Sequence, residues 1–295
     1  MLLPPIAIHP EPARRILRVP DDWIVWAFSD PHAVLSGVRA ALGEAGLVDA
    51  SLRWSAPPQT ALVGCGDYVD RGRESRALIE WLRQLEREAD AAGGAVMLAR
   101  GNHELQLLQS AAGDSAILEV WLRYGGWETL ASWGFSGTAA DVPALLRRLD
   151  EATPGVLAWF AGLAEAVRWR DVLFVHGGLP PGTTTDDFGT TTDEHLYVRS
   201  DFFERPWSDG AFAGFEAEGI RRVVFGHTPQ PYDARLFQDG RSLAIDTNAG
   251  RNPTLPADAR SMITLVELRD DVSLGDARRV VVDVADAPDR VAPPT

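Results

Sequence analysis

The chain has 295 residues, of which 45% are hydrophobic, and a formal net charge of −14. This length suits one large domain or two small ones, and the apolar content is enough for a full core. An acidic surface repels nucleic acid and anionic membranes, so we expect neither as a partner, although a local pocket can still bind a phosphorylated substrate. The single cysteine, Cys65, excludes a disulfide within the chain and is expected to be a small buried residue rather than a catalytic thiol.

The ends of the chain differ in composition from its middle. Five prolines within residues 1–21 predict an extended N-terminal arm, and residues 288–295 are expected to be a disordered tail. Residues 22–287 then form a single domain. The first residues lack the charged and apolar regions of a signal peptide, and no apolar run approaches the roughly 20 residues of a membrane span. We therefore expect a cytoplasmic protein.

Apolar runs of strand length alternate with helical patterns in the first 110 residues. The predicted strands are residues 23–29, 60–63 and 95–99, and the predicted helices are residues 34–42, 74–87 and 104–109. Ala92-Gly93-Gly94 is expected to cap the second helix at its C-terminus. The alternation of buried strands with helices predicts an α/β fold.

Residues 111–170 have a different character and predict a helical cap inserted beside the sheet core. The predicted helices here are residues 117–124, 142–150 and 155–166. Five tryptophans in this segment are expected to pack in a core rather than to stack on a ligand. Further strands are predicted at residues 171–175, 222–225, 243–245, 261–268 and 279–284.

Residue types that bind metals follow five of the predicted strands. They are Asp30 and His32, Asp67 and Asp70, Asn102 and His103, His176, and His227. In open α/β sheets, ligand sites gather outside the carboxyl ends of the strands, so we expect these side chains to lie close together. Carboxylate, imidazole and amide ligands without thiolate suit divalent manganese, iron or zinc.

The number of candidate ligands indicates two metal ions. Asp30, His32, Asp67, Asn102, His176 and His227 are too many for one tetrahedral site, and they suit two metals that share one carboxylate. Two metals about 3.5–4 Å apart are the arrangement for in-line displacement at phosphorus. The loop Gly64–Gly72 adds Arg71 beside Asp67 and Asp70, which makes a place for a metal and a phosphate together.

Five motifs, in this order and spacing, resemble one known family. They are Asp30-x-His32, Gly66-Asp67-x-Val69-Asp70-Arg71-Gly72, Gly101-Asn102-His103-Glu104, His176-Gly177-Gly178 and Gly226-His227-Thr228. They look like the signature motifs of the phosphoprotein phosphatase (PPP) branch of the calcineurin-like metallophosphoesterases. The chain length and the segment Gly125-Gly126-Trp127-Glu128-Thr129-Leu130 look like bacterial members of that branch.

The resemblance implies two mixed β-sheets sandwiched between α-helices, and two divalent metals, with Mn²⁺ preferred over Fe or Zn. It implies that Asp30, His32 and Asp67 hold the first metal. Asp67, Asn102, His176 and His227 then hold the second, with Asp67 bridging, and a metal-bridging hydroxide attacks the phosphoester.

The resemblance also implies roles for residues that do not bind metal. Arg71 and Arg199 would bind the substrate phosphate, because guanidinium groups suit bidentate contacts with phosphate. His103 would protonate the leaving oxygen, and Asp70 would orient that imidazole and raise its proton affinity.

The first motif departs from the usual Gly-Asp-x-His-Gly pattern, because it reads Ser29-Asp30-Pro31-His32-Ala33. Both ligands remain, and Ala33 is expected to fit if its φ is negative. The family's Asp-Thr-Gly segment reads Asp246-Thr247-Asn248, and asparagine tolerates the left-handed backbone where glycine is common.

Several other polar residues have simpler interpretations. His9 and His195 are expected to be exposed and without a role, and Glu104 is expected to supply charge at a helix start. Surface positions are expected for Arg73, Arg76, Arg221 and Arg222.

Three functions follow as hypotheses. The first is a phosphatase for phosphomonoesters, most plausibly on phosphoserine, phosphothreonine or phosphotyrosine in proteins. The second is a hydrolase of nucleotides such as dinucleoside polyphosphates, with the helical cap setting the choice. The third is a non-catalytic binding protein, which only the altered first motif favours.

Overall fold

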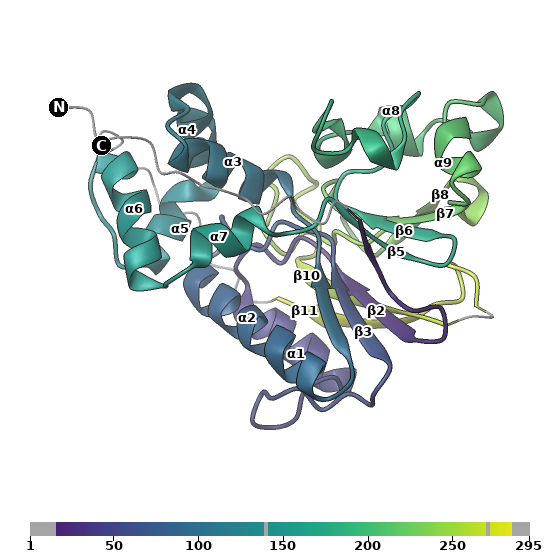
Figure 1. Ribbon diagram of the computed structural model, residues 1–295, viewed down its shortest axis with the longest axis horizontal. Helices are drawn as coiled ribbons and strands as arrows, with labels where there is room; N and C mark the ends of the chain where they lie inside the picture. Colours follow the sequence, from purple (N-terminus) through teal and green to yellow (C-terminus); the bar gives the residue numbers. More distant parts are fainter. Residues whose placement is uncertain (1–15, 139–140, 270–271, 285–295) are drawn as a thin grey trace.

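The computed structural model describes residues 16–138, 141–269 and 272–284. It confirms the predicted class: an α/β fold in which two mixed sheets lie face to face between helices (Figure 1). The strands are β1 (Ile16–Arg18), β2 (Ile24–Phe28), β3 (Thr60–Gly64), β4 (Ala95–Leu98), β5 (Ala166–Trp169), β6 (Val172–Val175), β7 (Arg222–Phe225), β8 (Arg235–Phe237), β9 (Ser242–Ala244), β10 (Met262–Leu268) and β11 (Arg278–Asp283).

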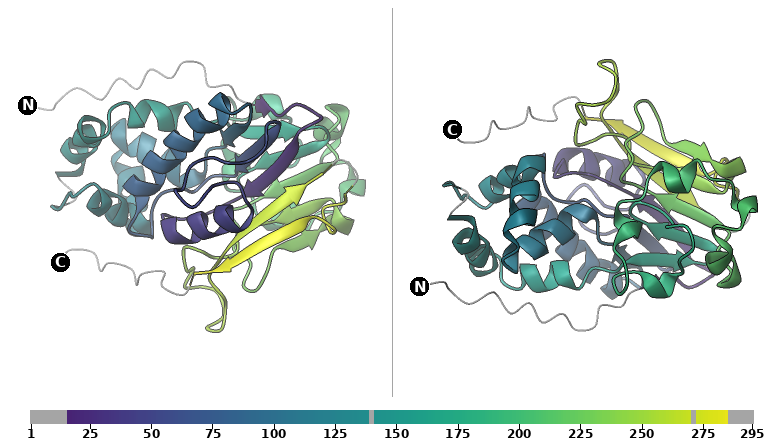
Figure 2. Two further views of the ribbon diagram at one scale, coloured as in Figure 1. Left: turned by 90° about the horizontal axis from the view of Figure 1, so that it is seen from below. Right: turned by 90° about the horizontal axis from the view of Figure 1, so that it is seen from above.

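The helices form three groups. In the first group, helices α1 (Leu35–Glu44) and α2 (Ser75–Ala91) cover the outer face of one sheet. The second group, called the inserted group, contains α3 (Asn102–Ala111), α4 (Ser115–Trp121), α5 (Trp127–Ser132), α6 (Val142–Ala152) and α7 (Val156–Ala161). Short helices α8 (Ser200–Phe203) and α9 (Ala213–Ala217) lie beside the other sheet. Figure 2 shows the inserted group to one side of both sheets.

The strand order places the carboxyl ends of three parallel strands together in each sheet. One sheet has the order β11-β10-β2-β3-β4, and the other has the order β1-β5-β6-β7-β9-β8. Strands β2, β3 and β4 are parallel to one another, as are β6, β7 and β9. The carboxyl ends of each parallel set therefore lie together, as the sequence predicts.

Apolar side chains fill the space between the two sheets and outside each of them. Val25, Val63 and Cys65 from one sheet pack with Phe174 and Leu243 from the other in a fully buried layer. Cys65 is thus the buried small residue predicted, and burial raises the pKa of its thiol, which makes a reactive thiolate unfavourable.

Helix α2 shows why the sequence pattern sufficed for the core elements. Leu78, Ile79, Leu82 and Leu85 recur at helical spacing and are all completely buried against the sheet. The helix ends where Gly94 donates its N–H to the carbonyl of Ala89, so the predicted glycine cap is confirmed.

Two predicted boundaries are wrong. Within the predicted arm, Ile16–Arg18 forms strand β1, which pairs in parallel with β5; residues 1–15 and the predicted tail lie outside the described residues. Within the predicted cap of residues 111–170, the last helix ends at Ala161 rather than at residue 166, because Ala166–Trp169 pairs with β6 as a strand of the sheet. These pairings join segments far apart in sequence, so local periodicity does not reveal them.

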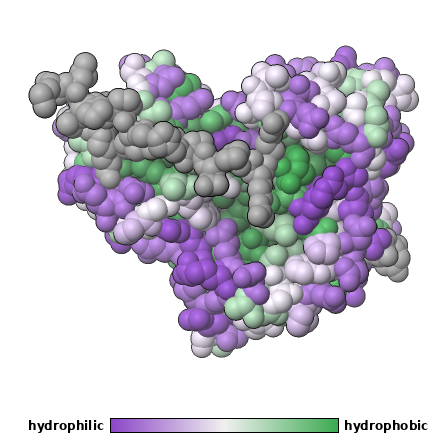
Figure 3. Space-filling view, viewed as in Figure 1, coloured by the Kyte–Doolittle hydropathy of each residue, from purple (hydrophilic) through white to green (hydrophobic). Residues whose placement is uncertain are grey.

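The surface is indented between two lobes (Figure 3). Helix α4 lies in one lobe and α8 in the other, as the same view in Figure 1 shows. Among the described residues, no helix has the length and apolar character that crossing a membrane requires.

Candidate metal and phosphate site

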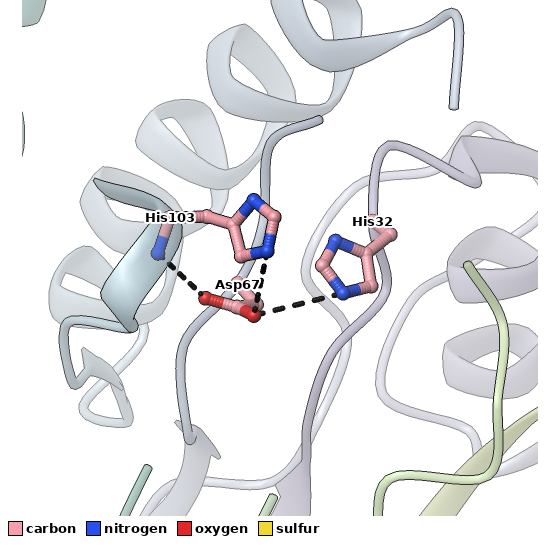
Figure 4. A group of neighbouring side chains, drawn as sticks. All are labelled: His32, Asp67 and His103. Carbon is pink, nitrogen blue, oxygen red and sulfur yellow. Dashed lines mark hydrogen bonds and ion pairs between the residues drawn. The ribbon is translucent and has the colours of Figure 1, made fainter. Parts of the chain in front are cut away.

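The predicted ligands meet at the shared edge of the two sheets, and Asp67 lies at their centre. Its Oδ2 is 3.6 Å from Nε2 of His32 and 3.7 Å from Nε2 of His103 (Figure 4), and its Oδ1 is 3.4 Å from Nε2 of His176. Asp67, His176 and His227 offer ligand atoms within 4.8 Å of one another. Asp67 is therefore placed as a shared carboxylate would be.

One side of the cluster contains an imidazole nitrogen without a hydrogen. Nδ1 of His32 lies 3.0 Å from the carbonyl oxygen of Val69, which can only accept, so Nδ1 carries the hydrogen. Nε2 is then an acceptor; it is buried, and no described residue donates to it. Oδ1 of Asp30 lies 4.0 Å from it. Acceptor atoms that face one another without a hydrogen fit a bound cation.

The other side repeats this arrangement. Nδ1 of His176 donates to the carbonyl of Cys65 at 2.8 Å, which leaves Nε2 as an acceptor. This nitrogen lies 2.9 Å from Oδ1 of Asn102, another acceptor. Two acceptors at that distance repel unless a cation lies between them, so Asn102, His176 and Asp67 fit a second metal.

The protonation states suit metal ligation, which needs neutral imidazoles and ionised carboxylates. Burial lowers the pKa of His32, His176 and His227. Burial alone would raise the pKa of Asp67, but the surrounding histidines hold it below its usual range.

Two further carboxyl groups crowd the same site. The pKa of Asp30 lies well above its ordinary value, because of burial and then of the charges of Asp246 and Asp67. Burial is also the main reason why the pKa of Asp246 rises to about 6. Bound cations would remove this repulsion between buried acids.

The altered first motif keeps its ligands by means of a strained backbone. The condition under which Ala33 was expected to fit, a negative φ, is not met: its φ is 58°, and Asp30 and His32 also lie in the left-handed region at 49° and 42°. Such backbone costs about 1–3 kcal/mol per residue. Backbone N–H groups of these three residues donate to the carbonyls of Gly66, Asp67 and Tyr68 at 3.0 Å each, and these bonds hold the segment in place. At Asn248, where asparagine was expected to tolerate such backbone, φ is 66°.

Glu104 does more than supply charge at the start of α3. Its carboxylate is completely buried and accepts backbone N–H bonds from Gly101, Asp67, Tyr68 and Val69 at 2.7–3.2 Å. One side chain therefore fixes both ligand-bearing loops, because Gly101 precedes Asn102 and the other three donors are Asp67 and the two residues after it. The sequence indicated only the capping role.

His103 differs from the ligand histidines in its partners. Its Nδ1 is 2.7 Å from Oδ2 of Asp70, and its Nε2 is 3.3 Å from Nη2 of Arg71. A guanidinium only donates, so Nε2 accepts and the hydrogen of the neutral ring lies on Nδ1, toward Asp70. Burial would lower the pKa of His103, but the charges of Asp67 and Asp70 outweigh it and raise that pKa. The hydrogen of the neutral ring is therefore held toward Asp70, and Nε2 is the nitrogen at which His103 can take up a further proton.

The two predicted phosphate-binding arginines face the same cluster. Nε of Arg71 is buried and has no hydrogen-bond partner among the described residues. Arg199 is an exposed side chain whose pKa is lowered by burial of part of its surface, and whose charge acts on Asp246 and Asp30. The positive charges of Arg71 and Arg199 both act on the buried carboxyl group of Asp246, beside the candidate ligands.

His195, predicted to be exposed, is instead completely buried, so that prediction is wrong. Its Nε2 lies 2.9 Å from Oε2 of Glu165, and its ring stacks on Phe188 with centroids 4.2 Å apart. Glu165 also pairs with Arg100, which directly precedes the Gly101–Glu104 motif. The carbonyl of His195 accepts from Gly177 at 2.8 Å, so this network ties the loops after β4 and β6 together.

We expect Glu165→Ala to destabilise the fold by about 3–5 kcal/mol, because it leaves the guanidinium of Arg100, whose side chain is only 12% exposed, without its counter-ion. Urea unfolding followed by circular dichroism measures this. The matched control is Glu216→Ala, which breaks the exposed pair with Arg241 and should cost less than about 1 kcal/mol. Equal costs for the two variants would show that the buried network does not stabilise the fold.

Comparison with known proteins assigns the family. Residues 24–246 match the family described as calcineurin-like phosphoesterase, and this span covers most of the chain and every ligand discussed above. The chain belongs to this family. It is therefore a metal-dependent phosphoesterase by family, and within the matched span its Asp and His side chains form groups that could hold metal ions.

Two relatives with similar sequences indicate the branch of the family. The uncharacterized protein C1840.07c of Schizosaccharomyces pombe is 28% identical over 76% of this chain and 72% of its own length. Shewanella-like protein phosphatase 2 of Arabidopsis thaliana is 40% identical over 83 residues, which are 28% of this chain and 21% of that protein. The second similarity supports the phosphoprotein phosphatase branch.

Solved structures agree with the fold. A cold-active protein-tyrosine phosphatase of a psychrophilic Shewanella species aligns with a TM-score of 0.60 at 18% identity, covering 90% of this chain and 82% of its own. A putative diadenosine tetraphosphatase aligns with a TM-score of 0.54 at 16% identity, covering 91% and 97%. At these identities the likeness concerns the fold alone.

Proposed function

We propose that this chain hydrolyses phosphomonoesters of phosphorylated proteins, on serine, threonine or tyrosine, with two divalent metals, manganese being the first choice. The observation that carries the proposal is the position of His103: bonded to Asp70 through Nδ1, beside the Arg71 guanidinium through Nε2, and at the edge of the acceptor cluster around Asp67. A proton donor, an anion-binding group and a metal site in contact are the parts that phosphoester hydrolysis needs.

The positions of the acceptor atoms suggest which residues would bind each metal. Asp30, His32 and Asp67 would hold one metal, and Asp67, Asn102, His176 and His227 would hold the other. Bound metals supply positive charge for the phosphate oxygens and lower the pKa of a coordinated water.

The remaining steps belong to side chains of the chain. Arg71 and Arg199 bind the phosphate oxygens and orient the ester, since guanidinium groups can contact two oxygens at once. His103 donates its Nε2 proton to the leaving oxygen, which would otherwise depart as an alkoxide. Asp70 holds the ring by its bond to Nδ1 and stabilises the protonated form.

The second candidate is hydrolysis of dinucleoside polyphosphates, which the fold shared with a putative diadenosine tetraphosphatase favours. The similarity to Shewanella-like protein phosphatase 2 favours the protein substrate instead. Comparative turnover of phosphoserine, phosphothreonine and phosphotyrosine peptides and of diadenosine tetraphosphate, with manganese present, separates the two. Faster cleavage of the dinucleotide would contradict the first proposal. Hydrolysis of none of them, nor of a simple aryl phosphate, would favour a binding protein.

A further inference from the structure

Asp70 is completely buried, and both of its carboxylate oxygens accept hydrogen bonds from side chains. Oδ2 accepts from Nδ1 of His103 at 2.7 Å and from the indole Nε1 of Trp121 at 2.9 Å. Oδ1 accepts from the hydroxyl of Thr129 at 2.5 Å. Neither Trp121 nor Thr129 belongs to the motifs at the strand ends.

The hydroxyl of Thr129 has a defined direction. It has one hydrogen, which must point to Oδ1 because an ionised carboxylate only accepts. It then accepts from the backbone N–H of Asp70 at 2.9 Å and from the hydroxyl of Ser75 at 3.0 Å. Thr129 therefore holds both the backbone and the side chain of Asp70, and the rotation of its carboxylate is fixed.

The chain between Trp121 and Thr129 has a conformation that lets both side chains reach Asp70. It passes through a π-helical turn, Leu122–Gly126, in which Gly125 has a φ of 121°. A Cβ on Gly125 would lie 2.4 Å from the backbone nitrogen of Arg71, and one on Gly126 would lie 2.6 Å from the indole of Trp121. Gly125 therefore lets the turn pack directly against the loop that carries Asp70 and Arg71, and Gly126 leaves room for the indole of Trp121.

We propose that Trp121 and Thr129 are positioning residues for the proton donor. They fix the carboxylate of Asp70 and thereby the ring of His103, so that Nε2 faces the leaving oxygen. This inference rests on the proposed function for its catalytic meaning. It gives the inserted helices a role in the chemistry in addition to any role in substrate choice.

The test compares substrates that need a proton donor to different degrees. Phenyl phosphate has a basic leaving group and needs protonation, whereas 2,4-dinitrophenyl phosphate has an acidic leaving group that departs without it. Thr129→Val removes the hydroxyl at constant shape, and Trp121→Phe removes the indole N–H. We expect each to lower kcat for phenyl phosphate by about 10–100-fold, and for the dinitrophenyl ester by less than about threefold.

Two further variants control for packing. Thr129→Ser keeps the hydroxyl and should restore most of kcat for phenyl phosphate. Ser132→Ala removes a hydroxyl from the same helix; within the described part of the chain, this hydroxyl bonds to the Thr129 carbonyl and the Arg76 N–H and not to Asp70. The substitution should leave the ratio of the two kcat values unchanged. Equal losses on both substrates in Thr129→Val and Trp121→Phe would overturn the proposal, because a loss of folding or of metal does not distinguish leaving groups.

A measurement without metal tests the positioning itself. The Nδ1 hydrogen of His103 should give a downfield proton NMR signal, absent in His103→Ala, that shifts in Thr129→Val and Trp121→Phe and not in Ser132→Ala. An unchanged signal in both would overturn the proposal. Failure of the wild type to hydrolyse either aryl phosphate would instead overturn the proposed function, whereas the NMR signal would still show whether the ring is held.

Discussion

Asp67→Asn should lower metal-dependent hydrolysis of p-nitrophenyl phosphate by at least about 10²–10³-fold. The carboxylate lies between both ligand groups, with one oxygen toward His32 and the other toward His176. Asparagine keeps an oxygen that can accept the 3.1 Å bond from the backbone N–H of His103, so the loop should remain folded. We therefore attribute the expected loss of activity to removal of the negative charge that two metals would share.

The experiment starts from metal-stripped protein with manganese, iron or zinc added back, and measures both rate and bound metal. The wild type should bind two metals, and Asp67→Asn fewer. Asp90→Asn, at the exposed end of α2, is the matched control and should keep full activity. Two tightly bound metals and a rate within about threefold of the wild type in Asp67→Asn would refute the shared-carboxylate site.

His103→Ala should lower kcat by about 10²–10⁴-fold while both metals stay bound. The physical reason is the loss of the proton donor: the Nδ1 hydrogen of this ring points to Asp70, and its Nε2 lies beside Arg71. By contrast, no residue that the structure describes donates to Nε2 of His32. Metal content by mass spectrometry and kcat with phenyl phosphate, whose basic leaving group needs protonation, measure the two effects separately.

The structure makes this a sharp test, because His32, Asp67 and His103 also offer ligand atoms within 4.8 Å of one another. If His103→Ala loses one metal, His103 is a ligand and the proposed division of roles is wrong. Gln109→Ala, near the far end of the same helix, is the control and should change neither quantity. Retained metals with an unchanged kcat would show that His103 is not the proton donor.

The sequence by itself determined the class of fold and the inventory of the site. Continuous apolar runs predict buried strands because both faces of β2 and β3 are covered, and polar ligand types directly after such strands must gather where parallel strands end. Asp67, His176 and His227 could therefore be assigned to one site without knowledge of their distances.

Tertiary structure alone decided what supports these residues. His195 lies in a polar stretch of sequence, and only the fold places Glu165 and Phe188 around it. Strand β1 forms because β5 offers it an edge about 150 residues away in the chain, a pairing that no local pattern encodes. The positive φ of Ala33 likewise depends on carbonyls of the neighbouring loop that fix its backbone.

Trp121 and Thr129 show most clearly which contacts cannot be predicted from the sequence alone. The sequence predicts a helix over residues 117–124 and a packing role for its tryptophan, and the burial of Trp121 agrees with that prediction. Yet a hydrogen bond from an indole or a hydroxyl to Asp70 depends on the direction of the side chain, which a π-helical turn sets and an amino-acid pattern does not. The sequence specifies which groups can do chemistry, and the fold specifies which of them hold the others in place.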